Sequence, residues 1–120
     1  MVGQRAAPPP PAGRVTAAEL ASALHDLLGE RLTAVIAGVR DARVVRSWAQ
    51  GRRTPPPEAE QRLRHAYEIA QLLLQYEESN SVRAWFLGTE PRLDDRAPAL
   101  VLGENPAAVA QAARAFLANG

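Results

Sequence analysis

The side chains best suited to chemistry in this chain form a compact set in its first half. When residues 42–50 are wound as a helix at about 100° per residue, one face carries two arginines, a serine and a glutamine. Arginine can donate two hydrogen bonds to guanine, glutamine can pair with adenine, and serine can contact a base or a phosphate. Three flanking arginines are suited to phosphate contacts. The predicted DNA-binding residues are Arg40, Arg43, Arg46, Ser47, Gln50, Arg52 and Arg53.

The distribution of charge also singles out this segment. The whole chain has a net charge of only +1, which by itself says nothing about nucleic acid. From Arg31 to Pro57, however, six arginines accompany a single acid, Asp41, so this stretch carries +5 while residues 58–120 carry −3. Local clustering of arginine is typical of a DNA-binding surface. The alternative interpretation is an ordinary solvated helix face.

Two short helices joined by a tight turn are expected to position these side chains. A helix over 31–37 stops at Gly38, and Asp41 caps a helix over 42–50. This pair predicts a helix-turn-helix in which the second helix reads DNA. The residues of the second helix expected to pack inward are Val44, Val45 and Trp48.

The segment before this pair supplies a further helix to pack against. Thr16 and Glu19 form a capping box, in which each side chain satisfies a free amide of the first turn. The leucines that follow have helical spacing, and Gly29 ends the helix. Residues 1–15, with four consecutive prolines, are predicted to be a flexible arm.

The second half also has only helical patterns. Helices are predicted over 57–78, 82–87, 98–102 and 106–118, with a break at 79–81. No stretch alternates with a period of two, so the predicted fold class is all-α. The predicted organisation is a Pro-rich arm (1–15), a DNA-binding domain with its long helix (16–78) and a small C-terminal domain (79–120).

The stretch from Ser81 to Gly103 resembles the toxin-binding domain of the Xre/MbcA/ParS antitoxin family. That family's pattern is an A-x-x-W-aliphatic helix, an x-P-x-L turn, a short P-x-x-aliphatic-aliphatic helix and a glycine. The matching residues here are Trp85-Phe86-Leu87, Pro91, Leu93, Pro98, Leu102 and Gly103. The family loop usually reads N-P at its turn, where this chain has Glu90-Pro91. The resemblance covers roughly residues 20–120.

The resemblance implies a type II antitoxin that binds its own promoter DNA and a cognate RES-domain toxin, an enzyme that consumes NAD. Neutralisation in this family is by obstruction, with the C-terminal region laid across the toxin's NAD cleft. The predicted toxin-binding residues are Trp85, Phe86, Pro91, Leu93, Arg114, Phe116, Leu117, Asn119 and Gly120. A stand-alone helix-turn-helix regulator without a toxin is the alternative function, and a scaffold with a degenerate helix-turn-helix is a third.

Two questions about packing stay open at this level. Trp85 and Phe86 are adjacent and so face different directions on a helix, which leaves one exposed for a partner or both in the core. Tight DNA binding usually needs two half-sites, so a homodimer through the N-terminal half is expected, with the leucines of helix 57–78 as its interface.

Other chemistries find little support. The chain has no cysteine, and His25 and His65 have no neighbours at ligand spacing, so no metal or cofactor is expected. The acidic pairs 77–78 and 94–95 are adjacent in sequence, as solvated or capping groups are, and no nucleophile has a base, so an enzyme is not expected. With no signal peptide and no apolar run of about 20 residues, we expect a cytoplasmic protein without membrane contact.

Overall fold

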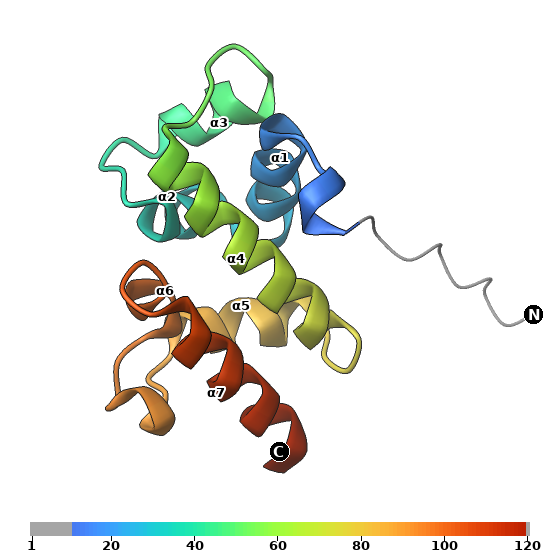
Figure 1. Ribbon diagram of the computed structural model, residues 1–120, viewed down its shortest axis with the longest axis vertical. Coiled ribbons are helices and arrows are strands. Elements are labelled where there is room, and N and C mark those ends of the chain that lie inside the picture. Colours follow the sequence, from blue (N-terminus) through green and yellow to red (C-terminus); the bar gives the residue numbers. More distant parts are fainter. Residues whose placement is uncertain (1–10, 120) are drawn as a thin grey trace, which may run out of the picture.

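The computed structural model describes residues 11–119 of the chain (Figure 1). Within them lie seven α-helices and two 3-10 helices, and the one β-interaction is an isolated bridge between Glu90 and Arg96. The predicted all-α class is therefore confirmed for these residues. The elements are η1 (Ala12–Arg14), α1 (Ala17–Leu28), α2 (Glu30–Ala37), α3 (Arg43–Ala49), α4 (Pro57–Leu74), α5 (Ser79–Leu87), η2 (Pro91–Leu93), α6 (Pro98–Val101) and α7 (Pro106–Asn119).

Local capping signals set the helix ends of the first half. The backbone N–H of Thr16 donates to Glu19 Oε1 at 2.8 Å, and the backbone N–H of Glu19 donates to Thr16 Oγ1 at 3.1 Å, so the predicted capping box is present. These hydrogen bonds, from the Thr16 backbone first, hold the pKa of Glu19 below its usual value. Gly38 ends α2 with φ of 79°, a left-handed conformation that suits glycine.

The prediction that helix 57–78 runs to Glu78 is wrong, because α4 ends at Leu74. Its buried stripe reaches Leu73, and the next position on that stripe is Glu77, a carboxylate that is costly to bury and unfavourable at a helix C-terminus. The break predicted at 79–81 is also wrong, since these residues form the first turn of α5. Among the helices of residues 11–119, none combines the length and apolar character needed to cross a bilayer.

The predicted arm is shorter than expected. Residues 12–14 form η1, and Val15 is buried in the core. The carbonyl of Val15 accepts a hydrogen bond from Arg64 Nη1 on α4 at 2.8 Å, which fixes this segment to the longest helix. The arm prediction is therefore wrong for residues 12–15, and residues 1–10 lie outside the described part of the chain.

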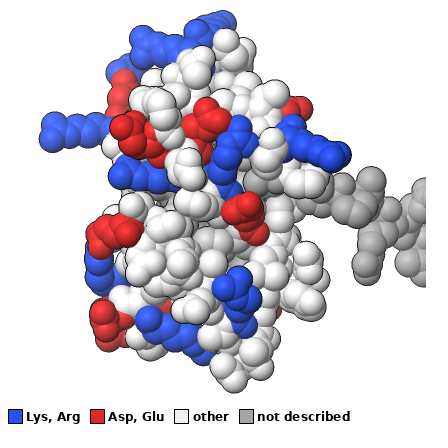
Figure 2. Space-filling view, in the orientation of Figure 1, with Lys and Arg blue, Asp and Glu red and all other residues white. Residues whose placement is uncertain are grey.

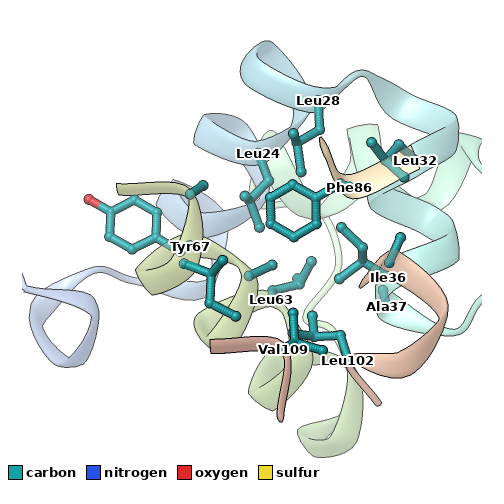
Figure 3. Packing of buried hydrophobic residues seen from close by; sticks show 14 of the residues in the cluster. Leu24, Leu28, Leu32, Ile36, Ala37, Leu63, Tyr67, Phe86, Leu102 and Val109 are labelled. Carbon is teal, nitrogen blue, oxygen red and sulfur yellow. The ribbon is translucent and has the colours of Figure 1, made fainter. Parts of the chain in front are cut away.

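One hydrophobic core holds both halves together. α4 crosses the molecule. It contacts α1 and α2, which precede it in the sequence, and α5 and α7, which follow it. Figure 3 shows Phe86 of α5 seated among Leu24 and Leu28 of α1, with Leu63 of α4 beside them. The buried residues form a single cluster, so the boundary predicted at residue 79 falls within one continuous core.

Candidate functional site

Helix α3 has one buried face and one exposed face. Val45 and Trp48 are buried, which confirms their predicted inward packing, and Val44 is half-buried. Arg43, Arg46 and Gln50 are exposed as predicted, whereas Ser47 is half-buried. α3 packs on α1 and α2 through its apolar side, so its polar side lies at one end of the molecule.

The turn after α3 presents two more arginines. The carbonyl of Ser47 accepts hydrogen bonds from the backbone N–H groups of Arg52 and Arg53, at 2.9 and 3.3 Å. Gly51 adopts φ of 74° within this turn. Figure 2 shows arginine atoms spread over the end of the molecule that α3 and the α3–α4 loop form, with acidic atoms next to them. The surface is basic, but acids interrupt it.

Asp41 pairs with the first arginine of the exposed face. Arg43 Nε and Nη2 lie 3.1 and 3.2 Å from the two Asp41 oxygens, and the Arg43 backbone N–H donates to Asp41 Oδ1 at 3.0 Å. The side-chain hydrogen bond from Arg43, followed by the backbone one, lowers the pKa of Asp41. The same side-chain bond raises the pKa of Arg43. The N-cap position of α3 is Ala42, so the prediction that Asp41 caps this helix is wrong by one residue; Asp41 instead accepts from the first residue of α3 and partly neutralises Arg43.

Glu30 pairs with the second arginine, and the sequence reasoning missed it. Arg46 Nη2 lies 3.2 Å from both carboxylate oxygens of Glu30, with the Arg46 side chain 61% exposed and that of Glu30 21% exposed. Glu30 is sixteen residues away at the start of α2 and just outside the basic stretch, so no local pattern reveals the pair. By contrast, Arg40 and Arg52 are exposed and form no ion pair within residues 11–119.

Replacing Glu30 by glutamine should strengthen binding of any polyanion to this face, because the Arg46 charge is no longer compensated. A surface pair of this kind changes the free energy by about 0.3–1 kcal/mol, so DNA affinity should rise by about 2- to 5-fold at low salt. Gel-shift titrations at two salt concentrations measure this. Glu104→Gln is the matched control, since it frees Arg96 from an exposed pair in the second half; an equal effect of both variants would contradict a role for the α3 face.

In the second half, the segment over residues 89–97, between α5 and α6, is held by its own contacts. The buried Glu90 carboxylate accepts from the Arg92 backbone N–H at 3.2 Å and from Arg92 Nη1 at 3.1 Å. Glu90 therefore caps η2, the task that an asparagine before proline commonly performs. Arg96 and Glu104 form two hydrogen bonds of 2.9 and 2.7 Å. The Arg96 hydrogen bond lowers the pKa of Glu104, and this pair holds the loop to the start of α7.

The predicted toxin-binding residues divide by exposure. Trp85 is 9% exposed, and Phe86 and Leu93 are buried, so of the two arrangements that the sequence leaves open, the one with both aromatic neighbours in the core is present. Trp85 packs edge-on against Phe86, with ring centroids 5.4 Å apart, and lies 6.3 Å from Phe116. Its indole N–H is buried without an acceptor in the described part of the chain. The exposed members of the set are Pro91, Arg114 and Asn119, the half-buried ones are Phe116 and Leu117, and Gly120 lies outside the described residues.

A groove between α4 and α7 is a feature that the sequence did not indicate. It has a volume of about 340 Å³, an apolar floor that includes Ile69, Leu72 and Ala110, and polar groups from His65, Glu68 and Arg114. The leucines of the predicted dimer interface on α4 are mostly used inside the chain: Leu63 and Leu73 are fully buried, and Leu72 and Leu74 are half-buried. Leu72 in this groove is thus a more accessible contact than Leu63 or Leu73.

Comparisons of this chain with family models, curated proteins and solved structures gave no match. The likeness to Xre/MbcA/ParS antitoxins is therefore carried by the motif between Trp85 and Gly103 and its position after a short helix pair. No relative supplies a partner for either surface.

Proposed function

We propose that this chain is a non-enzymatic antitoxin that binds its own promoter DNA through α3 and a RES-domain toxin through residues 79–120. The observation that carries the DNA half is the two-sided α3. Trp48 and Val45 anchor it in the core, which leaves Arg43, Arg46 and Gln50 on the exposed side, where they can enter a major groove once the arginines exchange Asp41 and Glu30 for DNA. The glycine turn at Gly38 and the short connection to α3 support the assignment of α2 and α3 as a helix-turn-helix.

The toxin half draws its support from the resemblance and from exposure. In this proposal Arg114, Asn119 and the half-buried Phe116 and Leu117 meet the toxin, with α7 lying across the NAD cleft. The buried residues of the motif then contribute indirectly, by supporting the elements that contact the toxin. Trp85, for example, supports α7 through its contact with Phe116 and need not touch the partner.

A stand-alone DNA-binding regulator is the second candidate, favoured by the same α3 surface. Co-expression of the tagged chain with the product of the adjacent reading frame, followed by purification, separates the two functions. A stable complex that protects cells and binds the upstream DNA supports the antitoxin. DNA binding without any complex supports the regulator, and no DNA binding at low salt rejects both the regulator and the DNA half of the antitoxin proposal.

Removing residues 118–120 should abolish protection from the toxin while leaving the protein folded. This cut keeps Phe116 on Trp85, whereas a cut that removes 115–120 would also uncover the indole. Cell survival and circular dichroism of each variant provide the measurement. Tyr76→Ala, at a side chain that is 69% exposed and lies outside residues 79–120, is the control and should still protect. Full protection by the folded 1–117 chain would show that the end of α7 does not block the cleft.

A further inference from the structure

The guanidinium of Arg62 on α4 lies between two glycines from opposite halves of the chain. Gly38 ends α2, and Gly103 follows α6. A methyl group at Gly38 would overlap Arg62 Nη1, and one at Gly103 would lie 2.8 Å from Arg62 Nε and 3.1 Å from Cζ. Both glycines therefore leave the space that the guanidinium occupies, and Arg62 touches both segments at once.

The position of this charge is favourable for the C-terminus of α2. Arg62 Nη1 donates to the carbonyl of Ala37, the last residue of α2, at 3.3 Å. The free carbonyls at a helix C-terminus carry partial negative charge, so a cation stabilises them. α2 and α6 are in contact, and the half-buried Arg62 side chain fills the space beside their ends.

Gly38 is also where the chain turns from α2 toward α3. Only residues 38–42 separate the two helices, and the Val39 backbone N–H bonds back to Ala34 of α2 at 3.0 Å. Arg62 contacts the chain where this turn begins, at Ala37 and Gly38. Gly103, at the other side of Arg62, belongs to the motif that resembles a toxin-binding domain.

We propose that Arg62 is a positioning residue that fixes the α2–α3 turn and links it to the end of α6. Movement at Gly103, as on binding a partner at residues 81–103, then changes how α3 presents its arginines to DNA. By thermodynamic linkage, DNA at α3 changes the affinity for that partner by the same factor. The link to DNA and toxin rests on the proposed function, but the mechanical link from Gly103 through Arg62 to Gly38 does not.

A double-mutant cycle with Gly103→Ala and Arg62→Ala tests this link. Gly103 does not have a left-handed backbone, so its substitution acts mainly through the contact with Arg62. We expect Gly103→Ala to speed amide hydrogen exchange at residues 38–43 by about 2- to 30-fold, the usual range for coupled sites. The same substitution in the Arg62→Ala background should have no further effect there. Gly88→Ala, a second-half glycine that meets only the Ala84 carbonyl, is the control and should leave these amides unchanged.

The four proteins of the cycle, which are the unchanged chain, the two single variants and the double variant, are then titrated with operator DNA. A change in exchange at residues 38–43 accompanied by weaker operator binding supports the whole proposal. The exchange change without any DNA binding keeps the mechanical link and rejects the DNA role of α3. Exchange changes that stay within α6 and α7, or that are equal with and without Arg62, overturn the proposal.

Discussion

Replacing Arg43 and Arg46 together by alanine should abolish sequence-specific binding to the DNA upstream of the coding frame. Each lost base contact is expected to cost about 1–3 kcal/mol, which is about 5- to 150-fold in affinity for each arginine. Both side chains are exposed and make no contribution to the hydrophobic core, so helix content and the thermal midpoint should change little. Gel-shift titration and circular dichroism of the same preparations measure the two quantities.

Arg114→Ala is the matched control for loss of an exposed arginine, because α7 lies at the opposite end of the molecule from α3 (Figure 1). Arg52→Ala and Arg53→Ala should behave differently from the α3 variants. As phosphate contacts they should weaken binding to all sequences alike and reduce the slope of log affinity against log salt by about one each. Undiminished operator binding by the Arg43 and Arg46 double variant would reject α3 as the reading helix.

Replacing Phe86 by alanine should destabilise the whole chain rather than its second half alone. A buried phenylalanine replaced by alanine costs about 3–5 kcal/mol, a large part of the roughly 5–15 kcal/mol that stabilises a typical domain. Phe86 is fully buried against leucines of α1. The cavity therefore lies where the two halves meet, and both should lose structure together.

Thermal unfolding followed by far-UV circular dichroism and by Trp48 fluorescence measures this cooperativity. The fluorescence experiment uses a Trp85→Phe background, so that the remaining tryptophan reports on α3. The two midpoints should fall together in Phe86→Ala. Leu87→Ala, at a neighbouring side chain that is 55% exposed, is the control and should change them little. A fluorescence midpoint that does not move while helix content is lost would mean that the halves unfold separately.

Signals that act within one turn of the chain predicted the helices well. The capping box of Thr16 and Glu19 formed as expected, and so did the start of α7, where Asn105 Oδ1 accepts from the Ala108 backbone N–H at 3.1 Å. The two-sided character of α3 followed from periodicity alone. The end of α4 did not, because residues 75–78 contain no glycine or proline that would mark a helix end, while the fully buried positions of the stripe stop at Leu73.

Features that depend on contacts between distant residues escaped the sequence analysis. The pair of Arg46 with Glu30 exists because α3 packs on α2, and the contact of Arg62 with Gly38 and Gly103 exists because α4 lies beside both turns. The burial of both Trp85 and Phe86 could not be predicted from helical position, since it depends on where α1 and α7 pack. Such contacts between distant residues leave no periodic pattern and no motif in the sequence.

The pairing of Arg46 with Glu30 has a consequence for how a DNA-binding protein finds its target on a chromosome. Contacts to phosphate are made equally well at every position, and a genome offers about a million or more competing positions. A carboxylate held against the arginine weakens all of these encounters. At the correct site the arginine can exchange Glu30 for a guanine edge, which accepts two hydrogen bonds from it. At other sequences only phosphate contacts are available, and these do not compensate for the lost ion pair as well. In the proposed function, the pair thus lowers the time spent on wrong DNA more than the time spent on the operator.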